Sequence, residues 1–197
     1  TDAAVLYTGL ANGDIDVFAS AWPEVTHVDY MERYGDDIED LGSYYDGAKL
    51  NLSVPEYMDD INSITDLEGQ GERFDGTIYG IEPGAGLTRA TEQDVLPGYG
   101  LDSEYALETS STPAMLSELQ SAVDDERDIV VTLWSPFWAN NEFPVRALED
   151  PEGLYGEPES LHFLARTGFT EEFPEVADWI AELQLSDEQY SDLENTV

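Results

Sequence analysis

The most hydrophobic segment of the chain is residues 128–138, with the sequence DIVVTLWSPFW. Residues 129–133 are all apolar or β-branched, without polar alternation, which is typical of a strand buried on both faces. Trp134 follows directly, and Pro136 ends the ladder because proline has no N–H to donate. We therefore expect a central strand that carries an indole at its carboxyl end.

Residues 16–23, DVFASAWP, repeat this arrangement, with an apolar run followed by Trp22 and then Pro23. In open α/β sheets, ligands bind beyond the carboxyl ends of the strands. Two strands that each end in a tryptophan therefore predict an aromatic-walled pocket lined by Trp22 and Trp134.

The rest of the chain alternates between short apolar runs and helical periodicity. Further strands are expected at 47–54, 77–81, 105–107 and 161–165, and helices at 3–11, 25–34, from 87, at 111–123, from 174 and after 186. Strands that alternate with helices predict an α/β fold with a mostly parallel sheet.

Some residues have expected local roles. Ser63 with Asp66, and Ser186 with Gln189, have the spacing of a capping box. Trp179 has helical spacing from Val176, which predicts a place for this indole in the core.

Charge is the most unusual feature of the composition. There are 44 acidic residues and 7 basic ones among 197, giving a formal net charge of -37. Such self-repulsion destabilises a compact state in dilute buffer, whereas at molar salt the Debye length falls to about 3 Å. We therefore expect adaptation to a very salty medium, and no binding to nucleic acid or anionic membranes.

Several kinds of chemistry find no support in the residues. Gly84-Ala85-Gly86 lacks the third glycine of a dinucleotide fingerprint, because position 89 is arginine. Asn12, Asp14 and Asp16 have the spacing of a calcium loop, but the glycine and the final glutamate are missing. There is no cysteine, no nucleophile motif and no apolar run long enough to span a membrane. No cofactor, metal or enzymatic activity is expected.

Two kinds of ligand group fit what remains. Aromatic faces such as those of Trp22 and Trp134 attract a quaternary ammonium ion. The turn at 84–86 is either a plain tight turn or the start of a helix whose N–H groups bind an anion.

Six segments of the chain resemble the substrate-binding proteins of glycine betaine ABC transporters: GDIDVFASAWPEVTH, GAKLNLSVPEYM, YGIEPGAGLTRA, IVVTLWSPFW, LEDPEGLYGEPESLHFLARTGF and FPEVADWI. The resemblance implies a type II periplasmic-binding-protein fold, with two α/β lobes around a ligand cleft. The expected division is 1–48 and 144–197 in lobe I and 49–143 in lobe II, with crossovers near 50–54 and 145–148.

The resemblance also implies roles for particular residues. Trp22 and Trp134 would form walls of a tryptophan box around a trimethylammonium group. Gly86 and Leu87 would offer N–H groups to the ligand carboxylate, and His27 would bind it too. The family's first strand, helix and third box tryptophan have no counterpart here, and its C-terminal helices are cut short. Either the chain is a fragment, or Tyr57 or Trp138 completes the box.

The expected function is that of the extracytoplasmic binding component of a compatible-solute importer, with an ABC permease as its partner. Any signal or membrane anchor would lie outside the sequence, which begins with Thr1. The ligand could be glycine betaine, proline betaine, carnitine or choline. A ligand-sensing domain of the same fold, or a hydrolase that uses acidic residues, remain the alternatives.

Overall fold

The computed structural model describes residues 2–194 and 196. The chain forms two compact units. Unit 1 comprises Thr1–Ala48 and Pro158–Leu193, and unit 2 comprises Lys49–Glu157 and Glu194–Val197. The first crossing between the units follows residue 48, and the second lies at Glu157/Pro158, whereas the sequence suggested residues 143/144.

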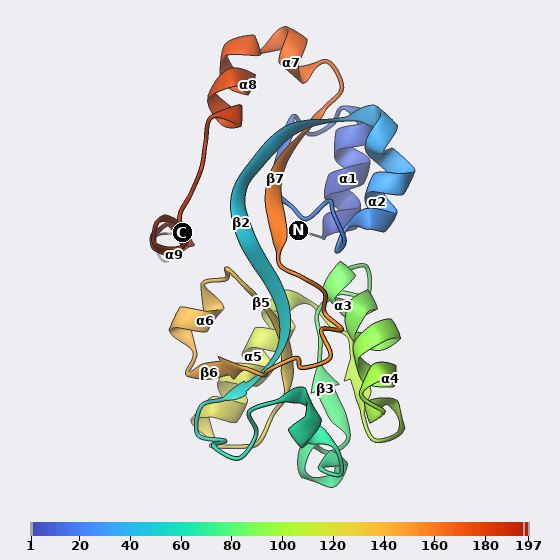
Figure 1. Ribbon diagram of the computed structural model, residues 1–197, viewed down its shortest axis with the longest axis vertical. Helices are drawn as coiled ribbons and strands as arrows, with labels where there is room; N and C mark the ends of the chain where they lie inside the picture. Colours follow the sequence, from blue (N-terminus) through green and yellow to red (C-terminus); the bar gives the residue numbers. More distant parts are fainter. Residues whose placement is uncertain (1, 195, 197) are drawn as a thin grey trace. The chain divides into compact units, whose positions relative to one another are not determined.

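Figure 1 shows the order of the helices and strands. The strands are β1 (Val17–Ala21), β2 (Ile38–Pro55), β3 (Thr77–Tyr79), β4 (Ala106–Glu108), β5 (Val131–Ser135), β6 (Val145–Ala147) and β7 (Glu159–Arg166). The α-helices are α1 (Ala3–Asn12), α2 (Val28–Tyr34), α3 (Gly86–Ala90), α4 (Leu96–Gly98), α5 (Thr112–Asp124), α6 (Ala139–Glu142), α7 (Phe169–Glu172), α8 (Pro174–Ala181) and α9 (Asp187–Glu194). A π-helical turn, Thr91–Val95, joins α3 to α4, and short 3₁₀ turns occur at Gly35–Asp37, Ile64–Leu67, Gly71–Phe74 and Leu101–Ser103.

In unit 1 the sheet consists of β1, β7 and the first part of β2, and every pairing is antiparallel. Tyr7 and Leu10 of α1 pack with Phe18, Ala21 and Leu164 in one cluster of buried side chains. A second cluster joins Leu41 and Ala165 to side chains of α7 and α8, namely Phe169, Ala177 and Ile180. The buried interior of unit 1 is therefore divided between small groups of side chains.

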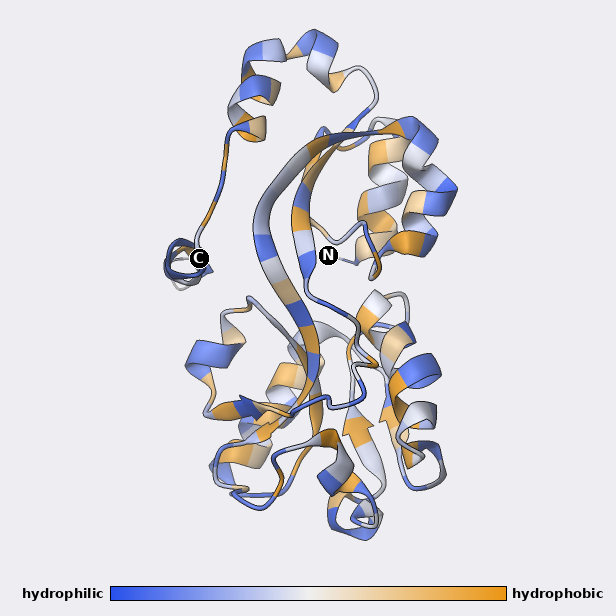
Figure 2. Cartoon of the chain, in the orientation of Figure 1, coloured by the Kyte–Doolittle hydropathy of each residue, from blue (hydrophilic) through white to orange (hydrophobic). Residues whose placement is uncertain are grey.

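In unit 2 the sheet consists of β4, β3, β5 and the second part of β2, with β6 paired to the end of β2. Its interior is one large cluster that includes Leu52, Ile78, Leu119 and Val131. Figure 2 shows hydrophobic residues along β3 and β5 and on the helices beside them. Because several strands and helices contribute side chains to this cluster, the ends of the strands in unit 2 are held in place by hydrophobic packing.

The expectation of a mostly parallel sheet is wrong. β3 pairs in parallel with β4 and β5, but β2 is antiparallel to β5, β6 and β7. The cause is the length of β2, which begins at Ile38 rather than near Gly47. Its first half, IEDLGSYYD, is too polar and interrupted to be predicted as a strand from hydrophobic periodicity.

The predicted capping boxes are confirmed, whereas the helix expected at 25–34 begins at Val28. The Ser63 side chain accepts a hydrogen bond from the turn that it precedes, and Asp66 accepts the Ser63 N–H at 2.9 Å. Ser186 and Gln189 bond reciprocally, with the Ser186 N–H donating at 2.9 Å and the Gln189 N–H donating back at 3.3 Å. Ser111 caps α5 by accepting from the Ala114 N–H at 3.3 Å. Caps of this kind can be predicted from the sequence because each depends only on the spacing of residues within one turn.

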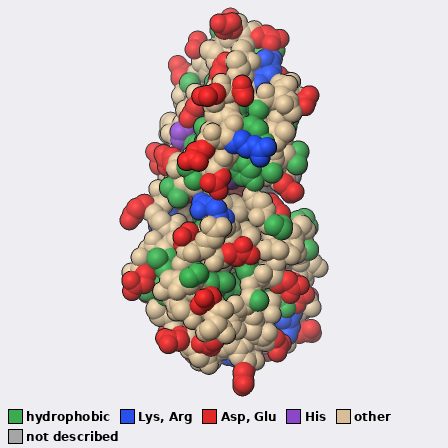
Figure 3. All heavy atoms as spheres, turned by 90° about the vertical axis from the view of Figure 1, so that its right-hand side faces the viewer, with side chains coloured by type: hydrophobic (Ala, Val, Ile, Leu, Met, Phe, Trp, Pro, Cys, Tyr) green, Lys and Arg blue, Asp and Glu red, His purple; other side chains and the backbone are tan. Residues whose placement is uncertain are grey.

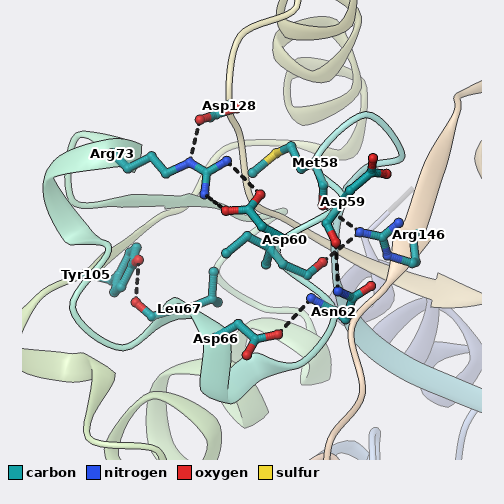
Figure 4. A network of polar contacts seen from close by, with 11 residues as sticks. Met58, Asp59, Asp60, Asn62, Asp66, Leu67, Arg73, Tyr105, Asp128 and Arg146 are labelled. Atoms are coloured by element: carbon teal, nitrogen blue, oxygen red, sulfur yellow. Dashed lines mark hydrogen bonds and ion pairs between the residues drawn. The ribbon is translucent and has the colours of Figure 1, made fainter.

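A network of polar side chains fixes the loop of unit 2 that follows β2 (Figure 4). Arg73 donates to both carboxylate oxygens of Asp60, at 2.6 and 3.1 Å, and to Asp128 at 2.6 Å. Arg146 of β6 donates to the carbonyls of Met58 and Ile61 at 2.7 and 2.8 Å. Two of the chain's few basic residues are thus used to hold one loop against the sheet.

Acidic side chains are scattered over the face of the molecule in Figure 3. With a formal net charge of -37, most of these carboxylates have no basic residue to pair with. The composition therefore places the excess charge on solvated surface, where added salt screens it.

Candidate functional site

Trp22 and His27 lie on one turn of unit 1, between β1 and α2. Trp22 follows the last residue of β1, and His27 precedes the first residue of α2. Two hydrogen bonds close the turn: the His27 N–H donates to the Trp22 carbonyl at 2.8 Å, and the Trp22 N–H donates to His27 Nδ1 at 3.1 Å. Both side chains are buried, with Trp22 7% exposed. The structure thus brings these two predicted residues together.

The hydrogen bonds of His27 determine where its proton lies. Nδ1 accepts from the Trp22 N–H, and the Tyr7 hydroxyl lies 3.3 Å from the same nitrogen. Because a backbone N–H can only donate, the neutral ring carries its proton on Nε2. Burial lowers the pKa of His27 to about 4, so the ring is neutral near pH 7. His27 therefore offers one hydrogen-bond donor, Nε2–H.

Tyr7 was not predicted as part of this region. Its ring lies edge-on to that of His27, with 5.4 Å between the centroids, and stacks on Tyr30 at 5.0 Å. Burial, and then the nearby charges of Asp40 and Glu159, raise the pKa of the Tyr7 hydroxyl. Nothing in the local sequence links α1 to His27, because the contact depends on how the helix packs against the sheet.

Gly86 and Leu87 begin a helical segment that runs through α3, the π-helical turn and α4. Both are buried, as is Thr88. Within the described part of the chain, the N–H groups of Gly86, Leu87 and Thr88 have no hydrogen-bond acceptor. Unsatisfied N–H groups at the start of a helix attract an anion. These N–H groups are the basis on which an anion site can be proposed at this turn.

Trp134 lies near the carboxyl end of β5 in the same unit. Since β3 and β5 are parallel and Tyr79 is paired with Val131, the residues that follow both strands lie at one edge of the sheet. Trp134 and the start of α3 are therefore at that edge. The Trp134 ring stacks on Phe137, with 4.0 Å between the centroids and 19° between the planes. Trp138, which is exposed, contacts Phe137 edge-on at 5.4 Å.

The structure does not bring Tyr57 together with Trp134. Its hydroxyl donates to the carbonyls of Ala122 and Arg127, at 3.2 and 2.6 Å, where α5 ends. These residues precede β5, whereas Trp134 lies near its other end. Tyr57 was suggested from its residue type, because its position relative to the strand could not be read from the sequence.

The expectation that Trp179 is a core residue is wrong. Trp179 is 67% exposed and Val176 is 45% exposed, while Ala177 and Ile180 are the residues of α8 that face the interior. Helical periodicity identified the helix but not which of its two apolar sides is buried.

Other kinds of site find no support within residues 2–194 and 196. No group of three or more His, Cys, Asp or Glu side chains there could hold a metal ion, and no described helix is long and apolar enough to cross a membrane. The groups that remain are donors and aromatic faces. In unit 1 they are Trp22 and the Nε2–H of His27, and in unit 2 they are Trp134 and the N–H groups at the start of α3.

Comparison with known proteins identifies the family of the chain. The family model described as the substrate binding domain of ABC-type glycine betaine transport system, OpuAC, matches residues 1–197. The glycine betaine/carnitine transport binding protein GbuC of Listeria monocytogenes is 44% identical over 119 residues, which are 57% of this chain and 39% of that protein. The glycine betaine/proline betaine-binding periplasmic protein of Escherichia coli is 25% identical over 93% of this chain and 66% of its own length.

Solved structures show the same fold. The lactococcal OpuAC in complex with glycine betaine is 35% identical, with a TM-score of 0.86, over 100% of this chain and 77% of that one. The ProX protein of Borrelia burgdorferi is 34% identical, with a TM-score of 0.87, over 100% of this chain and 73% of that one. An ABC-transporter choline binding protein with choline is 27% identical, with a TM-score of 0.81, over 98% and 68%.

The chain spans two thirds or less of the curated relatives that it matches. Members of the matching family are solute-binding proteins of type II periplasmic-binding-protein fold and not enzymes. Because the family model matches the chain from its first residue to its last, this protein belongs to the OpuAC family of ABC-transporter substrate-binding domains.

Proposed function

We propose that this protein is the substrate-binding component of a compatible-solute ABC importer, and that it binds glycine betaine or a related quaternary ammonium osmolyte. The observation that carries the proposal is the match of the glycine betaine family model to residues 1–197. Its partner is then an ABC permease, and it works outside the cytoplasm, tethered to the membrane by a segment beyond the sequence described here. The solvated acidic surface suits a medium of high salt.

Two indoles are candidates for contact with the ligand's cation. Trp22 supplies an indole in unit 1, and Trp134 supplies one in unit 2. A trimethylammonium group is attracted to the negative face of an indole, by roughly 1–2 kcal/mol where water is excluded. In unit 2, the stacked Phe137 covers part of the Trp134 ring and holds its plane. The exposed Trp138 beside it is a further candidate for contact with the ligand.

Ring and backbone N–H groups are the candidate donors for the ligand's carboxylate. These are the Nε2–H of His27 and the N–H groups of Gly86 and Leu87. Choline has a hydroxyl in place of the carboxylate and cannot accept from all of them. Buried donors left without an acceptor cost about 1–3 kcal/mol each. The donors therefore favour a betaine over choline, even though one similar structure holds choline.

A calorimetric titration in molar KCl tests the proposal, with glycine betaine, proline betaine, carnitine and choline as ligands. We expect a betaine to bind at least about tenfold more tightly than choline, which corresponds to one unsatisfied donor. His27→Ala should reduce that preference, because it removes a donor that only the carboxylate uses.

His162→Ala is the matched control for this titration. This second histidine is also in unit 1, but its Nδ1 pairs with Asp40 at 2.9 Å. The control should keep the preference of the unaltered protein. Equal affinities for glycine betaine and choline in the unaltered protein would show that the proposed carboxylate donors are not used.

A further inference from the structure

Glu159 is a buried acidic residue that no part of the proposed binding chemistry uses. It is the first residue of β7 and is 5% exposed. Its carboxylate accepts the Val25 N–H at 2.8 Å and the Thr26 N–H at 3.0 and 3.1 Å, and it also accepts the Thr26 hydroxyl. Burying a carboxylate is costly unless donors surround it, and here the donors come from the turn between β1 and α2.

The attachment between this turn and β7 is reciprocal. Glu24, on the turn, accepts the N–H of Ser160 at 3.2 Å, while Glu159 accepts the N–H groups of the two residues that follow Glu24. Two neighbouring residues of β7 are therefore bonded to three neighbouring residues of the turn. These hydrogen bonds to β7, together with the sequence of the turn, determine where the turn lies.

Trp22 and His27 stand at the two ends of the same turn. Because each bonds to the other through backbone and ring atoms, a shift of Val25 and Thr26 moves both residues. Loss of the Glu159 carboxylate would leave two N–H groups and a hydroxyl without their acceptor. The turn would then rearrange to reach water, and the bond from the Trp22 N–H to His27 Nδ1 would be lost.

We propose that Glu159 is a positioning residue that holds the indole of Trp22 and the Nε2–H of His27 in the geometry that the ligand needs. This inference rests on the proposed function for its ligand, but the geometry of His27 can be measured without one. The chain enters unit 1 at Pro158. Glu159, the next residue, is the one whose carboxylate holds the turn.

Unit 1 contains a second carboxylate with the same chemistry, which supplies a matched control. Glu39 of β2 accepts the N–H groups of Gly168 and Thr170, at 2.5 and 3.0 Å, and the Thr170 hydroxyl at 2.6 Å. It fixes the start of α7 rather than the turn with Trp22 and His27. A change at Glu39 therefore removes the same kinds of hydrogen bond from the same unit at a different place.

The experiment compares Glu159→Gln with Glu39→Gln in molar KCl. Calorimetry gives the glycine betaine Kd, and long-range ¹H–¹⁵N spectra give the tautomer of His27 in the absence of ligand. We expect Glu159→Gln to raise the Kd about tenfold, as the loss of about one satisfied donor implies. We also expect it to remove the pure Nε2–H signature of His27. Glu39→Gln should leave the Kd within about twofold of that of the unaltered protein and the His27 tautomer unchanged, while lowering the melting temperature.

A smaller change, Thr26→Val, keeps the test decisive if Glu159→Gln does not fold. It removes only the hydroxyl donor, and we expect a Kd raised about threefold with a visible shift of the His27 nitrogens. An unchanged Kd and unchanged His27 signals in the folded variants overturn the proposal. So does an equal loss of affinity in Glu159→Gln and Glu39→Gln, because that would reflect stability alone.

The proposed function and this inference fail in different ways. An unaltered protein that binds none of the four osmolytes contradicts the proposed function, and the His27 spectra then still decide whether Glu159 positions the turn. An unaltered protein that binds betaine while Glu159→Gln binds it equally well contradicts only the role of Glu159.

Discussion

The two units hold their candidate ligand groups by different means. In unit 1, Trp22 and His27 lie on a turn whose backbone N–H groups donate to a few side chains, above all the carboxylate of Glu159. In unit 2, Trp134 and the start of α3 follow parallel strands that are backed by one large hydrophobic cluster. Unit 1 therefore holds its candidate groups through polar contacts, and unit 2 holds its groups through hydrophobic packing. Loss of a hydrogen-bonding side chain should disturb the groups of unit 1, whereas loss of a buried apolar side chain should disturb those of unit 2.

Salt provides the largest expected contrast between the units. Dilution from molar KCl into low-salt buffer removes the screening of a net charge of -37, and we expect the fold to loosen or be lost. Unit 1, with its small buried clusters, should open before unit 2. Circular dichroism across a salt series would follow the overall loss, and hydrogen exchange would show the order. A melting temperature that does not change with salt would contradict this account.

Acid is expected to weaken unit 1 through His27. Its pKa is about 4 in the folded protein, below the ordinary value near 6.5, so the folded state favours the neutral ring. The unfolded chain then binds more protons between these values, and stability that is complete above pH 6.5 is lost as the pH falls toward 4. The loss attributable to His27 is on the order of 2–3 kcal/mol.

Denaturant unfolding at pH 7, 6 and 5 in molar KCl would test the effect of acid, with His27→Gln compared with the unaltered protein. The variant should lose less stability on acidification than the unaltered protein does. Parallel curves for His27→Gln and the unaltered protein would argue against a buried neutral ring. Because His27 stays neutral above pH 6.5, betaine affinity should also stay constant between pH 7 and 8.5.

Removal of the indoles should weaken binding to a similar extent in each unit but affect stability differently. Trp22→Ala and Trp134→Ala should each raise the glycine betaine Kd roughly tenfold, the equivalent of a cation–π contact of about 1–2 kcal/mol. Trp22 is the more buried of the two and belongs to the unit with the smaller clusters, so its loss should cost more stability. Calorimetry and thermal unfolding separate the two effects. A Trp22→Ala variant with unchanged affinity would remove Trp22 from the proposed chemistry.

The same contrast explains how much of the structure could be predicted from the sequence. Three kinds of feature follow from local pattern, and the structure contains all of them: the strand that carries Trp134 near its end, the helix expected from residue 87, and the capping residues Ser63 and Ser186. Their signals lie within a few residues of one another. The family resemblance added the betaine ligand and the role of His27, which local patterns could not supply.

Features that depend on distant contacts were not predicted. The role of Glu159 requires a residue 134 positions away, at Val25, to supply its donors. The contact between Tyr7 and His27 joins positions 20 apart on different elements. The first half of β2 is stabilised by its partner β7, and its polar sequence gives no strand signal by itself. In each case the structure is determined by a partner that the local sequence does not identify.

The smallest expected effect is that of Trp179→Ala, which separates an exposed indole from the buried Trp22 of the same unit. Trp179 is 67% exposed on α8, and the side chains that anchor this helix are Ala177 and Ile180. Exposed substitutions that touch no cap, cavity or network usually change stability by less than about 0.5 kcal/mol. Alanine also favours a helix more than tryptophan does, which offsets part of any lost contact. We therefore expect an unchanged glycine betaine Kd and a melting temperature within a few degrees of the unaltered protein.

Ile180→Ala, one position along the helix, should instead lower the melting temperature clearly, because a buried large-to-small change costs about 2–5 kcal/mol. If Trp179→Ala proved as destabilising as Ile180→Ala, then Trp179 would have to be a packing residue in solution, and the division of unit 1 into small clusters would need to be redrawn around α8.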